Sequence, residues 1–66
     1  MISGTIFRVM LDKGFGFIER EGGVHYFFYR TAVEGAPFES LRAGQRVTFE
    51  EGNGIKGPRA NRVIVS

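Results

Sequence analysis

The sequence of 66 residues contains no cysteine and only one histidine, His25. Without thiols, neither a disulfide nor a thiolate metal site can stabilise the fold. A single histidine leaves a zinc site almost no ligands, and we interpret His25 as a solvent-exposed residue at the edge of a strand. We therefore expect neither a metal nor any other cofactor.

Long apolar runs are also absent, because charged residues interrupt each run after a few positions. This excludes a membrane-spanning helix. Met1–Phe7 lacks the basic start and the long apolar stretch of a signal peptide. We therefore expect a cytoplasmic protein in a reducing compartment, with no membrane partner.

Residues that could carry out catalysis are few, and no set of nucleophile, base and orienting group can be assembled from them. Asp12, Glu19 and Glu21 form a candidate carboxylate cluster, but turn and surface positions account for them. The stretch GNGIKG (residues 52–57) matches G-x-G-x-x-G, a motif that must open a helix to bind a dinucleotide, and Pro58 follows it at once. We expect a binding protein that is not an enzyme and has no small-molecule substrate.

The size and the charge of the chain set further limits. A single domain over residues 1–66 would bury only about 60% of its unfolded surface, so its core is modest. The net charge is +2, the pI is near 9.5, and seven arginines accompany two lysines. This balance is compatible with a nucleic-acid partner without requiring one.

Strand-length segments alternate with glycine-rich breaks, and no segment has a convincing helical period. Residues 11–14 and 19–23 have the glycines of hairpin turns. Residues 31–44 form one long connection, with a helical turn expected at residues 31–34, and residues 51–58 are expected to form a flexible loop. The predicted strands are Gly4–Met10, Phe15–Arg20, Val24–Arg30, Gln45–Glu51 and Asn61–Val65.

Five short strands in so small a chain favour an all-β fold, a five-stranded antiparallel Greek-key barrel, because closure removes exposed edges. The long connection after the third strand fits a Greek-key crossing. Side chains alternate between the two faces of a strand, which predicts one apolar set for the interior. Its members are Ile18, Tyr26, Phe28, Val47, Phe49, Val63 and Val65.

With that core filled, four aromatic rings remain on the opposite face of the second and third strands: Phe15, Phe17, Phe27 and Tyr29. If these strands are neighbours, the rings form one patch, and a contiguous apolar patch on a small protein usually marks a contact surface. In the alternative interpretation, the patch packs under the connection at residues 31–44. That connection offers only Val33, Phe38 and Leu41 to cover it.

Positive charges accompany the patch. Lys13 opens the second strand, Arg30 closes the third, and Lys56 and Arg59 lie in the last loop. Arg8 joins them if a bulge in the first strand turns it outward. Aromatic rings that stack on unpaired bases, together with cations that hold phosphates, are typical of proteins that bind single strands.

Two stretches now show a family resemblance. KGFGFI (residues 13–18) resembles the first ribonucleoprotein motif of the cold-shock domain family, and YFFYRTAV (residues 26–33) resembles the second. SLRAGQRVTFE (residues 40–50) and KGPRANRV (residues 56–63) extend the resemblance over nearly the whole chain. The resemblance implies a single domain with the oligonucleotide-binding (OB) fold, similar to bacterial cold-shock-like proteins. Members of this family bind single-stranded RNA and DNA and often act as RNA chaperones.

Residue by residue, the resemblance implies base stacking by Phe15, Phe17, Phe27 and Phe38, with Lys13 and Lys56 at the nucleic-acid backbone. Departures from the family pattern are also present. Arg8 replaces a usual tryptophan, Tyr29 a histidine and Arg30 a phenylalanine, while Phe7 replaces a lysine and Val9 an aromatic residue. Tyr29 can still stack on a base, and so can a guanidinium plane.

We therefore expect a monomeric protein that binds single-stranded RNA or DNA and acts as an ATP-independent RNA chaperone or as a regulator of transcription or translation. The alternative function is a small β-barrel module that docks another protein on the same aromatic face. The fringe of cations favours nucleic acid, because the core of a protein–protein interface is depleted of charge. The predicted binding residues are Arg8, Lys13, Phe15, Phe17, Phe27, Tyr29, Arg30, Phe38, Lys56 and Arg59.

Overall fold

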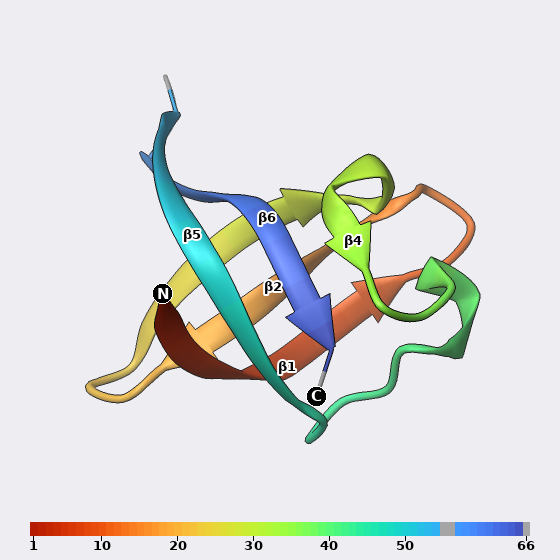
Figure 1. Ribbon diagram of the computed structural model, residues 1–66, viewed down its shortest axis with the longest axis horizontal. Coiled ribbons are helices and arrows are strands. Elements are labelled where there is room, and N and C mark those ends of the chain that lie inside the picture. Colours follow the sequence, from red (N-terminus) through yellow and green to blue (C-terminus); the bar gives the residue numbers. More distant parts are fainter. Residues whose placement is uncertain (55–56, 66) are drawn as a thin grey trace.

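The computed structural model describes residues 1–54 and 57–65 and contains strands and two single-turn 3-10 helices (Figure 1). No helix among these residues is long and apolar enough to cross a membrane. In chain order the elements are β1 (Ile2–Met10), β2 (Phe15–Arg20), β3 (Val24–Tyr29), η1 (Arg30–Ala32), β4 (Val33–Glu34), η2 (Phe38–Ser40), β5 (Arg46–Gly54) and β6 (Gly57–Val65).

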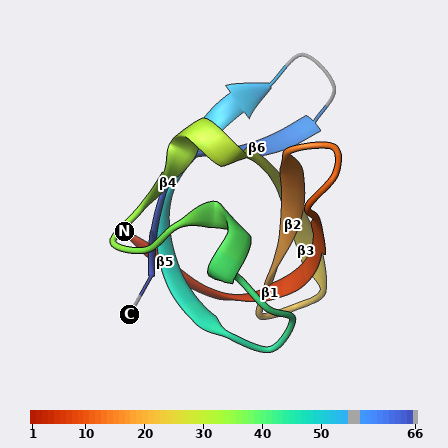
Figure 2. The ribbon, with the colours of Figure 1, turned by 90° about the vertical axis from the view of Figure 1, so that its right-hand side faces the viewer.

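The five long strands close into a barrel, which confirms the predicted fold class. β1, β2 and β3 form an antiparallel meander, β5 returns to pair with β1, and β6 pairs with β5. A short parallel pairing of β3 with β6, at Phe27 and Arg59, closes the ring that is visible in Figure 2. β4 adds two residues that pair with β6 in parallel.

The interior follows the predicted alternation, with additions. Ile18, Phe28, Phe49 and Val63 are fully buried, and Val65, which was also predicted for the core, is partly buried against it. Four core residues were not predicted for the interior: Ile6 of β1, Ala60 of β6, and Phe38 and Leu41 of the long connection. Every described element from β1 to β6 except η1 and β4 therefore contributes a buried apolar side chain.

Gly16 explains why glycine separates Phe15 from Phe17. It lies on the inner side of β2, and a Cβ atom built on it would come within 2.8 Å of both the Arg8 carbonyl oxygen and the Phe28 ring. The interior ring of Phe28 thus occupies the space that a side chain at position 16 would need. Phe15 and Phe17 lie on the outer side of the same strand.

The long connection closes one end of the barrel (Figure 2). The segment with η2 lies across that end, and the Phe38 ring packs edge-on against Phe28 with centroids 6.3 Å apart. The predicted helical turn is present as η1, one residue earlier than expected, and Val33–Glu34 is a short strand. Because Phe38 and Leu41 are buried in the core, they do not cover the aromatic patch.

The expected loop at residues 51–58 is wrong for the residues that the structure describes. β5 continues to Gly54 and β6 begins at Gly57, with pairings that include Gly52 opposite Arg59 and Asn53 opposite Pro58. A register shift between Glu50 and Glu51 marks an irregularity in this hairpin. The hairpin carries its backbone pairing through a stretch that has few apolar side chains.

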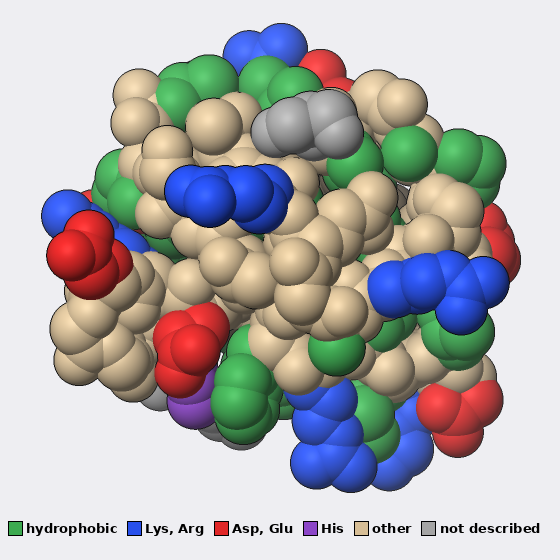
Figure 3. Space-filling view, turned by 90° about the horizontal axis from the view of Figure 1, so that it is seen from below, with side chains coloured by type: hydrophobic (Ala, Val, Ile, Leu, Met, Phe, Trp, Pro, Cys, Tyr) green, Lys and Arg blue, Asp and Glu red, His purple; other side chains and the backbone are tan. Residues whose placement is uncertain are grey.

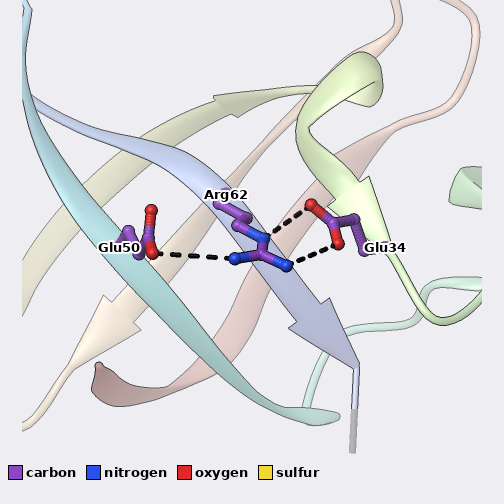
Figure 4. Close-up of polar contacts among 3 residues, drawn as sticks. All are labelled: Glu34, Glu50 and Arg62. Atoms are coloured by element: carbon purple, nitrogen blue, oxygen red, sulfur yellow. Dashed lines mark hydrogen bonds and ion pairs between the residues drawn. The ribbon is translucent and has the colours of Figure 1, made fainter.

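Ion pairs join β4, β5 and β6 on the outside of the barrel (Figure 4). Arg62 donates from Nε and Nη2 to the two carboxylate oxygens of Glu34, at 2.7 and 3.1 Å. Its Nη1 lies 3.8 Å from Glu50. The hydrogen bonds from Arg62 lower the pKa of Glu34, and those to Glu34 raise the pKa of Arg62. This contact fastens the two-residue strand β4 to the sheet.

Candidate nucleic-acid interface

Four rings come together on the outer side of β2 and β3: Phe15, Phe17, Phe27 and Tyr29, here called the aromatic face. The register places Phe15 opposite Tyr29 and Phe17 opposite Phe27. Phe27 is central, because its centroid lies 5.3 Å from Phe15, 5.7 Å from Phe17 and 4.7 Å from Tyr29. The three phenylalanines are half-buried and Tyr29 is 47% exposed. The predicted grouping of these rings is present in the structure.

A bulge in β1 decides which side chains of that strand join the aromatic face. Ile6 pairs with Ile18, but Arg8 rather than Phe7 pairs with Phe17, so the register shifts by one residue. Directly opposite residues share a face, so the guanidinium-bearing Arg8 lies on the outer side beside Phe17. Bulges commonly re-aim a side chain in this way. The bulge on which the prediction for Arg8 depends is therefore present, and Arg8 faces outward.

Arg59 of β6 lies at the other side of the aromatic face. It pairs with Phe27 across the β3–β6 closure, and its guanidinium carbon is 5.0 Å from the centre of the Tyr29 ring. This is cation–π geometry. Lys13 is exposed in the turn that precedes Phe15. The predicted Lys56 lies outside the described residues.

Arg30 lies at the margin of the aromatic face and is engaged with another group. Its Nη2 donates to Glu39 at 2.8 Å, and its guanidinium carbon is 5.9 Å from the centre of the Phe38 ring. Its backbone N–H donates to the carbonyl oxygen of Gly14, which fixes it beside the β1–β2 turn. Gly14 has φ of 77°, a conformation that favours glycine. Among the ion pairs of the described residues, Arg8, Lys13 and Arg59 have none.

Phe38, which the family resemblance predicts to stack on a base, lies in the core of the structure. Its ring is only 4% exposed and belongs to the core cluster, where it contacts Phe28 at the end of the barrel. Its ring therefore exposes little surface in this structure, and base stacking by Phe38 stays a prediction. The physical reason for the burial is that the barrel end needs an apolar cover, which a phenylalanine in the crossing segment provides.

Sequence reasoning did not include Phe7 or His25 in the site. Their rings are stacked, with centroids 4.2 Å apart and planes at 27°. His25 Nε2 also lies 3.2 Å from Glu19 of β2. In Figure 3 the histidine lies beside hydrophobic and acidic side chains. This contact depends on the bulge in β1, and the residue types alone do not predict that bulge.

The aromatic face is a partly exposed apolar surface on the outer side of β2 and β3. A shallow polar groove lies elsewhere, between the start of β1 and the β2–β3 turn, and its charged side chains, from two arginines and two glutamates, balance one another. Within the described residues, no three histidine, cysteine or acidic side chains gather as a metal site requires. Rings with free faces, flanked by cations, are suited to stack on planar groups that carry negative charge.

Comparison with known proteins agrees with this geometry. The model of the 'Cold-shock' DNA-binding domain family matches residues 2–66. Cold shock protein CspD of Bacillus subtilis (strain 168) is 51% identical over 53 residues, which cover 80% of each chain. Cold shock-like protein CspLB of Listeria monocytogenes is 46% identical over 63 residues, 96% of each chain, and CspE of Bacillus anthracis is 49% identical over 63 residues, 96% of this chain and 94% of its own. The chain therefore belongs to the cold-shock domain family, a family of nucleic-acid-binding proteins.

Proposed function

We propose that the protein binds single-stranded RNA or DNA by stacking unpaired bases on the aromatic face. The observation that supports this most is the contact of four rings on one outer sheet surface, three of them around Phe27. A contiguous apolar surface of this kind on a small barrel usually marks a contact surface, and its rings suit a partner with flat apolar groups. Bases of an unpaired strand have such groups on both sides.

The cations favour nucleic acid over a protein partner. Arg8 lies beside Phe17, Arg59 lies over Tyr29, and Lys13 precedes Phe15, so positive charge surrounds the rings. The centre of a protein-docking surface is usually depleted of charge. In the proposed complex, these three side chains contact phosphates while the rings contact bases. Lys56 is proposed for the backbone through the family resemblance alone, and Arg30 would first have to exchange Glu39 for a phosphate.

Binding of this kind supplies chaperone activity without ATP. Pairing hides the faces of bases, so only the open form of a nucleic acid can occupy the aromatic face. A protein that binds the open form shifts the equilibrium toward it by mass action. We propose this as the way in which the monomer, a binding module without catalysis, acts on structured RNA or regulates transcription or translation.

A titration of one sequence as a single strand and as a blunt duplex tests the proposal. We expect the single strand to bind far more tightly, and weak hairpins to open as protein is added. Fluorescence anisotropy at a fixed salt concentration measures both. A duplex bound as tightly as the single strand would contradict stacking as the mode of binding.

A further inference from the structure

The aromatic surface continues beyond the four rings of the aromatic face. Phe7 is 49% exposed, and the side chain of His25, stacked on it at 4.2 Å, is 39% exposed. Both are planar groups at the surface, and neither fills the core. The stacked pair thus offers ring area that the four-ring face does not use.

The position of this pair follows from the register of three strands. His25 lies two residues before Phe27 on β3, and its cross-strand partner Glu19 lies two residues after Phe17 on β2. Residues two apart on one strand share a face and are about 7 Å apart. Phe7 reaches His25 from β1, where it is the extra residue of the bulge between Ile6 and Arg8. The pair is therefore the next row of the same outer surface.

The stacked pair makes contacts within the protein. Glu19 lies 3.2 Å from Nε2 of His25, and the imidazole ring packs against the phenyl ring. A ring already held in its binding orientation loses less entropy when a ligand orders it. The charge here also differs from that around the aromatic face. The carboxylate of Glu19 repels phosphate, so the pair suits the neutral face of a base.

From these contacts we infer that Phe7, supported by His25, is a further stacking position for one unpaired base of the strand that lies on the aromatic face. The inference rests on the proposed function and adds a position to it. Arg8 follows Phe7 in the chain and lies beside Phe17, between the two stacking surfaces. It is placed to contact the phosphate that links the base on Phe17 to the base on Phe7.

The test compares oligothymidylates of about four to eight nucleotides, a range that matches the site sizes of OB folds. We expect the affinity of the parent to rise at the length that first reaches Phe7. In Phe7→Ala that rise should be smaller by about 5- to 150-fold, from the ~1–3 kcal/mol that one stacked base contributes. Phe7→Trp keeps a ring and should keep the rise. Val24→Ala is the matched control, because Val24 is 44% exposed next to His25 but on the opposite side of β3.

Proton NMR supplies a second readout, because His25 is the only histidine in the sequence and its ring signals are unambiguous. They should shift with the longest oligothymidylate and stay nearly unchanged with the shortest. The further stacking position is refuted if Phe7→Ala keeps the full rise of affinity with length, or if the His25 signals stay unchanged at saturation. In either case, tight binding of short oligomers would still support the aromatic face. If the parent binds no length at all, the proposed function itself fails.

Discussion

Replacing Phe27 with alanine removes the ring on which the aromatic face depends most. Phe27 contacts Phe15, Phe17 and Tyr29 with centroid distances of 4.7–5.7 Å, and it is only half-buried. One stacked base contributes about 1–3 kcal/mol, so Phe27→Ala should weaken binding of an unstructured oligonucleotide by roughly 5- to 150-fold. Aromatic pairs contribute about 0.5–1.5 kcal/mol each, and a half-exposed ring realises part of this, so the free energy of unfolding should fall by roughly 1–2 kcal/mol.

The adjacent residue provides the matched control. Phe28 is fully buried on the inner side of the same strand, so Phe28→Ala should lower the free energy of unfolding by about 3–5 kcal/mol. Urea unfolding measures stability, and anisotropy of a labelled oligonucleotide measures affinity under conditions where each variant is folded. Phe27→Ala should lose affinity more than stability, and Phe28→Ala the reverse. If folded Phe27→Ala binds as tightly as the parent and loses as much stability as Phe28→Ala, the reasoning about the two faces is refuted.

Further expectations concern packing, salt and pH. Gly16→Ala should cost about 1–3 kcal/mol in urea unfolding, because its Cβ would lie 2.8 Å from the Phe28 ring; unchanged stability would contradict this. If three to five cations meet phosphates, log affinity should fall against log salt with a slope of roughly −2 to −3.5, and Arg8→Ala should flatten it by ~0.7; an unchanged slope would remove Arg8 from the site. Because the pKa of Glu34 is lowered in the folded protein, ionised Glu34 stabilises the fold above its ordinary pKa of 4.5, and this stabilisation is lost as pH falls below 4.5 through the lower folded-state pKa. The free energies of unfolding of parent and Glu34→Gln should therefore converge in acid, and a constant difference would contradict this.

The barrel and the aromatic face could be predicted because alternation is a local property of a strand. Ile18, Tyr26 and Phe28 are buried while Phe17 and Phe27 lie outside, as the period of two requires. The same rule could not predict the length of the β5–β6 hairpin. Gly52 and Gly54 are poor strand residues, and there the backbone pairing of the hairpin outweighs their low propensity.

The position of Phe38 could not be predicted from its neighbours in the sequence. It lies in a connection, and connections usually run over the surface. The open end of the barrel, which exists only after strands distant in sequence have assembled, draws the ring inward against Phe28. A tertiary requirement thus sets the burial of Phe38, while its predicted stacking on a base stays a prediction.

The bulge in β1 is the third feature that sequence reasoning could state only as a condition. With strict alternation from Ile6, Arg8 would point inward and Val9 outward. The shift after Ile6 reverses both, so that Arg8 pairs with Phe17 and Val9 packs against the core. It also leaves Phe7 free to stack on His25. One extra residue in the ladder therefore sets the composition of this side of the site.

Mapping of the bound surface by NMR tests the central claim most directly. Ring protons of Phe15, Phe17, Phe27 and Tyr29 should shift strongly when an unstructured oligothymidylate is added, because stacked bases lie against them. Phe49 is fully buried inside the barrel, so its ring protons serve as the internal reference and should change little. If the largest shifts instead fall on the polar groove around Ser3 and Arg46, with the rings of the aromatic face unchanged, the account is contradicted.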